Sequence, residues 1–186
     1  MDAPVPTPAS SDDRTVTGVQ LIPSAEFHFF MDFQSPFYQP YHRIPELEQE
    51  LIKLKQELDC VYLNGRISQK QLAIEMLKSD VWLYPTEFKE TYCITALEMQ
   101  LAKCLCIYSN PSCLNEVVGN RGIITKNDVT TIEYDNEILE ILKKLKEGEI
   151  DKESYINKAY TWALKQSWEN RITEVLHLLN DNVYFF

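Results

Sequence analysis

The sequence has few basic residues for its size. It carries 18 Lys and Arg against 28 Asp and Glu, so its formal net charge is −10. A nucleic-acid backbone or an anionic membrane surface is bound by clustered Lys and Arg, so neither is expected as the main partner. A negatively charged protein can still bind one nucleotide through its backbone amides. The charge balance therefore argues against a nucleic acid or an anionic membrane as the main partner, but not against small phosphate ligands.

The sequence also lacks the cysteine patterns of a disulfide framework or a zinc site. Its five cysteines are odd in number, form no CxxC pair and lie mostly in apolar runs. This pattern is typical of reduced, buried thiols in a cytosol-like compartment. No apolar run approaches the length of a membrane span, and the N-terminal stretch MDAPVPTPASSDDRT lacks the apolar core of a signal peptide. We therefore expect a cytoplasmic chain with no metal.

Several catalytic motifs are missing as well. No Walker A motif, GxSxG or complete GxGxxG occurs, and the three histidines are scattered. The 186 residues are 45% hydrophobic and 11% aromatic, which is enough for a real core. We expect a disordered tail over residues 1–17, where Pro, Ser, Thr and Asp dominate, and one domain over residues 18–186.

Within the domain, short apolar runs alternate with amphipathic segments. The runs predict strands at Glu26–Phe33, Cys60–Leu63, Val81–Tyr84, Leu105–Tyr108 and Gly122–Thr125. Short apolar strands that alternate with helices are typical of a parallel sheet covered on both faces. The predicted fold class is therefore α/β, with a Rossmann-like, doubly wound parallel sheet.

The segments between the runs predict helices. Apolar residues from Ile44 to Leu58 recur at spacings of three and four, and the sequence from Ser68 to Gln71 has the form of a capping box. A further helix is expected after Thr95, and a short one ends near Gly119. Beyond residue 134 the chain reads as helical, including a long segment over residues 154–179, which gives the domain a helical C-terminus.

The stretch EFKETYCITALEMQ follows a predicted strand and leads into a helix. Ligands of doubly wound sheets bind at the carboxyl ends of the strands, where such loops lie. A helix start favours a phosphate, and Glu90 and Glu98 flank this one at positions where carboxylates can accept hydrogen bonds from sugar hydroxyls. The structural alternative is that acidic residues favour a helix start through its dipole alone.

This region resembles the signature of family 4 glycosyltransferases, which are retaining, nucleotide-sugar-dependent enzymes of the GT-B fold. Their pattern is a strand, Pro-Ser or similar, a short gap and then Glu-Gly-Phe-Gly-Leu-Pro-x-Leu-Glu-Ala-Met. The segment VWLYPTEFKETYCITALEMQLAKCLCI has the strand, Pro85-Thr86, Glu90, Tyr92 for Phe, and Leu97-Glu98.

The resemblance extends in the same order over about residues 20–180. LNGRISQKQLAIEMLKSDVWLYP resembles the preceding segment of the family, and SNPSCLNEVVGNRGIIT resembles the following one. LKQSWENRITEVLHLL is similar to the family's closing segment with Ser-Trp. The match covers the C-terminal, donor-binding half of a GT-B enzyme, so the domain is identified as a single GT-B C-terminal-type domain.

The resemblance implies roles for residues near the helix start. Glu90 would occupy the catalytic position and contact hydroxyls of the donor sugar, and Glu98 would contact the ribose. The backbone amides near Cys93, Ile94 and Thr95 would face the diphosphate or the sugar.

The resemblance also implies a nucleobase-binding segment. Gly65, Arg66 and Ile67 would border the base of the donor, although Arg66 is equally well explained as an exposed surface arginine. The donor would be a nucleoside diphosphate sugar, with no separate cofactor and no metal. Its base and sugar are not specified by the sequence.

Three departures from the family pattern keep several hypotheses open. Thr91 and Cys93 replace both glycines of the motif, Lys103 stands where the family has glycine, and the acceptor-binding half has no counterpart. The chain is expected to transfer a hexosyl group with retention, completed by a separate acceptor-domain chain or by self-association. The alternatives are a non-catalytic nucleotide-sugar-binding or interaction module and an inactive fragment of a split glycosyltransferase.

Overall fold

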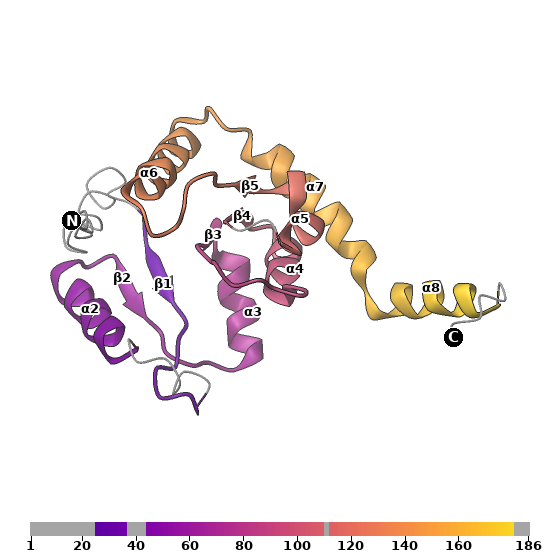
Figure 1. Ribbon diagram of the computed structural model, residues 1–186, viewed down its shortest axis with the longest axis horizontal. Helices are drawn as coiled ribbons and strands as arrows, with labels where there is room; N and C mark the ends of the chain where they lie inside the picture. The colour runs from indigo at the N-terminus through magenta and orange to yellow at the C-terminus, as the bar shows by residue number, and fades with distance from the viewer. Residues whose placement is uncertain (1–24, 37–43, 110–111, 181–186) are drawn as a thin grey trace, which may run out of the picture. The chain divides into compact units, whose positions relative to one another are not determined.

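The computed structural model of the protein describes residues 25–36, 44–109 and 112–180. The predicted tail over residues 1–17 lies outside the described residues. The chain divides into two compact units, residues 1–73 and 74–186, and each is described by itself. Figure 1 gives the labels of the helices and strands.

The first unit is built on a parallel pair of strands. Strand β1 (Phe27–Phe29) pairs with β2 (Val61–Leu63), with Phe27 opposite Val61. β2 was predicted at this place, but β1 is shorter than the predicted strand over residues 26–33. Only three residues of β2 are available for pairing, and a backbone bond from Ser35 N to Asp32 O (3.0 Å) turns the chain away soon after β1.

Helix α2 lies in the first unit, and α3 runs across the boundary into the second. In α2 (Ile44–Glu57), Leu51 is buried and Leu54 is half-buried, as expected for one apolar face, whereas Leu47 of the same face is exposed. The capping box opens α3 (Gln69–Lys78): Gln71 N donates to Ser68 Oγ (3.3 Å), and Ser68 N donates to Gln71 Oε1 (3.2 Å). These reciprocal bonds satisfy N–H groups that a helix start leaves without partners.

The second unit is built on a three-stranded parallel sheet. The strands are β3 (Val81–Tyr84), β4 (Leu105–Tyr108) and β5 (Ile123–Ile124), in the order β3-β4-β5. The helices of this unit are α4 (Ile94–Leu101), α5 (Leu114–Val117), α6 (Ile132–Glu147), α7 (Lys152–Ala163) and α8 (Trp168–Asn180). Two short 3-10 helices, η2 (Gly119–Arg121) and η3 (Leu164–Gln166), complete it.

The core of the second unit lies on both faces of β4. Cys106 and Tyr108 pack with residues of α4 and α5, whereas Leu105 and Ile107 pack with residues of α6 and α7. Successive side chains of a strand point to opposite faces, so a strand that is buried on both faces is apolar throughout. The predicted α/β class with parallel strands is confirmed, and the arrangement is compatible with a Rossmann-like fold. The GT-B assignment stays a prediction.

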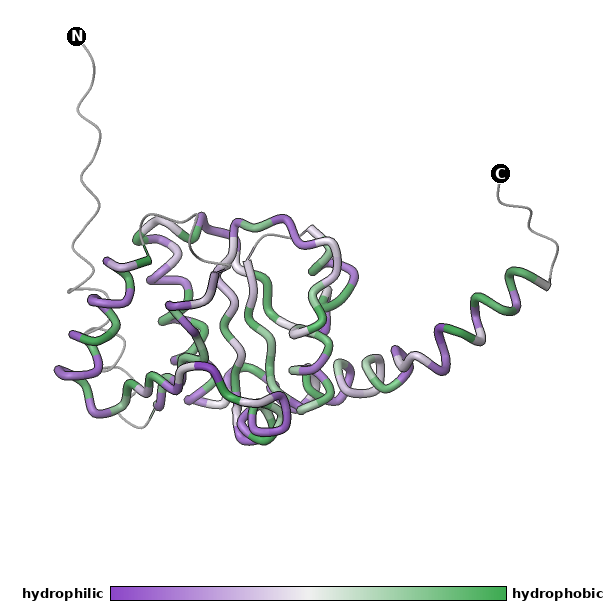
Figure 2. The backbone as a smooth tube through the Cα atoms, turned by 90° about the horizontal axis from the view of Figure 1, so that it is seen from below, coloured by the Kyte–Doolittle hydropathy of each residue, from purple (hydrophilic) through white to green (hydrophobic). Residues whose placement is uncertain are grey.

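The helical segment predicted over residues 154–179 is interrupted. Ser167 is extended (φ −68°, ψ 154°) and separates η3 from α8. Its hydroxyl accepts a hydrogen bond from Asn170 N (3.3 Å), which caps the new helix. Hydrophobic and hydrophilic residues alternate along α8 (Figure 2). In the part of the chain that the structure describes, no helix is long and apolar enough to cross a membrane.

Candidate functional site

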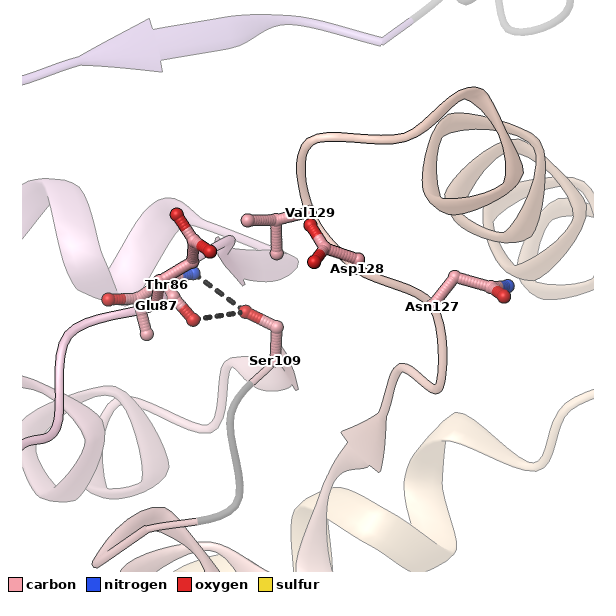
Figure 3. Close-up of a pocket in the computed structure, with 6 residues that line it drawn as sticks. All are labelled: Thr86, Glu87, Ser109, Asn127, Asp128 and Val129. Carbon is pink, nitrogen blue, oxygen red and sulfur yellow. Dashed lines mark hydrogen bonds between the residues drawn. The ribbon is translucent and has the colours of Figure 1, made fainter. Parts of the chain in front are cut away.

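The loop between β3 and α4 leaves the carboxyl end of the sheet and is fixed there by Ser109. The Oγ of Ser109 accepts a hydrogen bond from Thr86 N (2.6 Å) and donates one to Thr86 O (2.9 Å) (Figure 3). Ser109 itself is buried at the end of β4, and its backbone N–H donates to Tyr84 O (3.2 Å). One side chain therefore fixes the direction in which the loop leaves β3.

Glu90 lies in this loop and is held by a tyrosine of β3. The hydroxyl of Tyr84 donates a hydrogen bond of 2.7 Å to Glu90 Oε1. Burial, followed by the hydrogen bond to Glu90 and the charge of that carboxylate, raises the pKa of Tyr84 to about 12. Glu90 is half-buried, and the bond to Tyr84 restricts the directions in which its carboxylate can point.

The start of α4 has no side-chain cap. Cys93 is its N-cap residue but makes no capping hydrogen bond, and the first turn contains no acidic residue. The first intrahelical bond runs from Leu97 N to Cys93 O (3.4 Å), so the three N–H groups before Leu97 make no backbone bond within the helix, and those of Thr95 and Ala96 face the Cys93 thiol, where they lower its pKa against the larger effect of burial. These groups and the positive end of the helix dipole can bind an anion.

The side chain of Cys93 points into the protein. Cys93 is buried in the core cluster that contains Ala96 and Tyr108, and burial raises the pKa of its thiol. A buried thiol of raised pKa is a poor nucleophile. Cys93 can therefore offer a ligand its backbone, but not its sulfur.

The remaining predicted residues of α4 share its exposed face. Ile94, Thr95 and Glu98 are exposed, whereas Ala96 and Gln100 are buried on the other side of the helix. Residues three and four apart in a helix lie on one face, so the structure brings the carboxylate of Glu98 to the same surface as Ile94 and Thr95. This is the surface on which the sequence predicts the ribose and the phosphates.

The predicted nucleobase residues belong to the first compact unit. Gly65, Arg66 and Ile67 connect β2 with α3; Arg66 is exposed and Ile67 is half-buried. Gly65 has φ +65°, a conformation that favours glycine. Because Glu90, Glu98 and the helix start belong to the second unit, the structure describes the predicted base-binding residues and the predicted sugar and phosphate residues as two separate groups.

One part of the surface around the loop was not predicted from the sequence. A hollow of about 280 Å³ at the carboxyl ends of the three strands is lined by Thr86, Glu87, Ser109, Asn127, Asp128 and Val129 (Figure 3). The last three follow β5, so the rule that ligands bind beyond the carboxyl ends of the strands could have found them.

The polar groups of this hollow largely bind one another or nearby residues. Asn127 Nδ2 donates to Glu137 Oε2 (2.9 Å). The carboxylate of Asp128 accepts from Thr130 N (2.9 Å) and Thr130 Oγ1 (2.6 Å), and these two bonds lower its pKa. The polar groups of Asn127 and Asp128 therefore stabilise the turn between β5 and α6.

The described residues contain no group of three or more His, Cys, Asp or Glu that could hold a metal ion. The chemistry that the arrangement can perform rests on hydrogen-bond acceptors and helix-start N–H groups. Comparison of the chain with protein-family models and with curated proteins gives no match.

Proposed function

We propose that the chain binds a nucleoside diphosphate sugar at the start of α4 and forms the donor-binding half of a retaining glycosyltransferase. The observation that carries this proposal is a helix start without a side-chain capping hydrogen bond, between the half-buried carboxylate of Glu90 and the exposed carboxylate of Glu98. Cys93 provides no side-chain cap, the first turn has no acidic residue, and Glu98 lies on the exposed face one turn further along. These features are those of an anion site flanked by acceptors for hydroxyl groups.

Each group has a defined task in this proposal. The N–H groups of Ile94 and Thr95 bind the diphosphate, and Glu98 accepts hydrogen bonds from the ribose hydroxyls. Glu90 accepts from hydroxyls of the sugar through Oε2, while Tyr84 holds Oε1 at 2.7 Å. The same N–H groups stabilise the negative charge that develops on the leaving diphosphate, so the reaction needs no metal.

The backbone of Lys103 provides independent support for the family resemblance. Lys103 has φ +60° in the turn between α4 and β4. Only glycine adopts such a conformation without steric cost, and this is the position at which the family has glycine. The turn has therefore the geometry that the resemblance implies, although the residue differs.

Transfer to an acceptor requires a second protein surface. A half-cleft leaves a bound sugar open to water and provides nothing to orient the attacking hydroxyl. The chain is therefore proposed to act with a separate acceptor-binding chain or through self-association.

A non-catalytic nucleotide-sugar-binding module is the second candidate. Cys93 replaces a glycine of the motif and fills the core with its side chain, at 5% exposure. The backbone at this position is consequently more restricted than a glycine would be. The helix start can bind a phosphate despite this restriction. Close approach of a reacting sugar, in contrast, needs the room and the backbone freedom that a glycine provides. An inactive fragment would show neither binding nor transfer.

The test is a titration of the ¹⁵N-labelled chain with UDP, GDP, ADP and their sugar conjugates, followed by NMR. Donor binding is expected to shift the amide signals of residues 90–98, and of residues 64–67 if the base contacts them, with preference for one base. The absence of shifts at millimolar ligand would reject both binding hypotheses.

A pair of variants assigns the site. Glu98→Ala is expected to weaken binding about 10-fold or more, because hydrogen bonds to a charged group contribute about 1.5–3 kcal/mol. Glu116→Ala, which removes another exposed helical glutamate, is the matched control. Equal affinity of Glu98→Ala and the parent chain would show that the ribose assignment is wrong. Glycosyl transfer after addition of a candidate acceptor chain separates the enzyme from the binding module.

A further inference from the structure

Helix α8 carries an apolar stripe that nothing in the described structure covers. Every described side chain from Trp168 to Leu179 is exposed. Trp168 is 80% exposed, and the other large apolar side chains of the helix are 50–56% exposed. These side chains are Ile172, Val175, Leu176, Leu178 and Leu179.

The spacing of these residues is that of a helix–helix contact. Trp168, Ile172, Val175 and Leu179 recur at intervals of four, three and four residues. Such intervals place the side chains in one line along the helix, as in the seam of a coiled coil. An isolated helix of this length is only marginally stable in water, and most helices in proteins are stabilised by packing of their apolar face. The stripe therefore indicates a helical partner surface.

We propose that the apolar stripe of α8 binds the α8 of a second copy of this chain, with the two helices antiparallel around a two-fold axis. In this arrangement Trp168 of each copy packs against Leu179 of the other, and Ile172 packs against Val175. Both pairs form twice, because a two-fold interface uses the same surface of both subunits. Each pair combines two apolar side chains, and no charged residue of the helix falls within the seam.

The charges of α8 favour a second copy as the occupant. The helix has two acidic residues, Glu169 and Glu174, one arginine, Arg171, and one histidine, His177, whereas the whole chain has a net charge of −10. Arg171 Nη1 lies 2.7 Å from Glu174 Oε2, so the pair is largely neutral. Two copies that approach each other through this surface meet little local repulsion. A strongly basic or acidic partner would find no complementary charge beside the stripe.

The available area is sufficient for a dimer of moderate affinity. The four side chains of the seam present about 500 Å² per copy, so their mutual burial would remove about 1,000 Å² from water, which is at the lower end of the range of specific interfaces. The helix is short and two chains must be ordered, so we expect a dissociation constant of about 1–100 µM. The inference is independent of the proposed donor site, because no residue of α4 contributes to it.

Sedimentation of the full chain over a range of concentrations tests the proposal. The parent chain is expected to pass from monomer to dimer, and Ile172→Glu to raise the dissociation constant about 10-fold or more. Leu77→Glu changes a side chain of α3 that is 68% exposed, and it is expected to leave the equilibrium unchanged. A parent chain that stays monomeric up to millimolar concentration would overturn the proposal and leave the stripe to a different protein.

A second pair of measurements leaves the apolar side chains of α8 unchanged, so its result does not depend on whether Ile172→Glu destabilises the helix. Arg171→Glu keeps the apolar stripe and adds negative charge beside it. It is expected to weaken the dimer at low salt and to recover toward the parent value when salt screens the repulsion. The parent dimer is likewise expected to tighten from about 0.05 to 0.3 M NaCl. Weakening with salt would overturn an apolar interface between like-charged copies.

The orientation of the helices has its own test. In the double variant Ile172→Cys, Val175→Cys, mild oxidation is expected to join position 172 of one copy to position 175 of the other, as detected by mass spectrometry of the peptides. Cross-links that join position 172 to 172, and 175 to 175, would show a parallel pair and overturn the two-fold antiparallel arrangement. Dimers that are linked only through native cysteines would overturn the contact at α8.

Discussion

Single side chains determine how the loop after β3 is held. Ser109 binds both polar backbone groups of Thr86, and Tyr84 binds the carboxylate of Glu90. Cys93 anchors the end of the loop in the core. The loop that carries the candidate sugar-binding carboxylate is therefore fixed at its beginning, in its middle and at its end before any ligand arrives, which reduces the entropic cost of binding.

The Tyr84–Glu90 contact predicts a shift in the titration of one tyrosine. In Glu90→Ala, the pKa of Tyr84 is expected to fall from about 12 toward its ordinary value of 10.0, because a hydrogen-bond acceptor and a negative charge are both removed. It should stay above that value, because burial of the ring is the largest cause and remains. NMR titration of ¹³C-labelled tyrosine measures the change.

Tyr134 serves as the internal control in the same sample. Burial, with smaller contributions from Asp135 and Glu137, raises its pKa to about 12, and it does not contact Glu90. An unchanged Tyr84 titration in Glu90→Ala would contradict the contact.

The raised pKa of Tyr84 also makes stability depend on pH. Its contribution to the stability of the fold is fully present below pH 10, where the tyrosine of the unfolded chain is protonated, and it is lost as the pH rises toward 12. The free energy of unfolding of Tyr84→Phe should therefore fall less between pH 10 and 12 than that of the parent chain.

The Ser109 hydroxyl is expected to contribute to stability. Ser109→Ala leaves Thr86 N and Thr86 O without their side-chain partner at a partly buried position. We expect the free energy of unfolding to fall by about 1–3 kcal/mol, as measured by urea denaturation. Ser154→Ala, at a half-buried surface position of α7, should change it by less than about 0.5 kcal/mol. Equal effects of the two substitutions would show that Ser109 does not fix the loop.

At the scale of elements, the central strand β4 packs against helices on both of its faces. Alternate residues of β4 pack toward α4 and α5 on one face and toward α6 and α7 on the other. Helix α4 is thereby seated with Ala96 and Gln100 inward, and its opposite side, with Thr95 and Glu98, faces solvent. The accessibility of the candidate site follows from how the sheet buries the other side of this helix.

Gly122 controls how closely the segment before β5 approaches β4. A Cβ atom at this position would lie 2.5 Å from Cys106 O and 2.5 Å from Val118 Cγ1. Gly122→Ala is therefore expected to destabilise the protein by about 1–3 kcal/mol, at the upper end because one neighbour is backbone. Thermal or urea unfolding measures the loss.

Gly148 provides the comparison for Gly122. It ends α6 with φ +75°, and an added Cβ would meet nothing within 4 Å. Gly148→Ala should cost about 1 kcal/mol, from backbone conformation alone. If Gly122→Ala cost no more than Gly148→Ala, the close approach at β5 would not limit the packing.

For the whole molecule, ligand binding and stability are linked. A ligand that binds only the folded chain stabilises it by about 2.7 kcal/mol when it is present at 100 times its dissociation constant. For a protein of this size, that corresponds to a rise of about 5–10 °C in the unfolding temperature. We expect this rise with one nucleoside diphosphate sugar, measured by scanning calorimetry.

The variant Glu98→Ala tests whether the thermal effect arises at the proposed site. At the same ligand concentration its rise should be smaller by about 3 °C or more, because a 10-fold loss of affinity removes about 1.4 kcal/mol. An identical rise in both proteins would place the ligand elsewhere. Calorimetry without ligand provides the baseline for each variant.

The elements that were predicted well are those with strong local signals. The apolar runs Val81–Tyr84 and Leu105–Tyr108 are strands with the predicted bounds, and the capping box places the start of α3. The less accurate boundaries depend on distant contacts. β1 is shorter than its apolar run because its partner β2 is short, and α8 is separated from α7 by the extended backbone of Ser167.

The sequence by itself determined the α/β class, the order of the elements and the position of a helix start between Glu90 and Glu98, because periodicity and capping are local properties of the chain. Only the tertiary structure decided that Tyr84 holds Glu90, that Ser109 fixes Thr86 and that Cys93 points inward. It also revealed the uncovered stripe of α8. These features depend on which surfaces pack against one another, and packing joins residues whose distance along the chain carries no local signal.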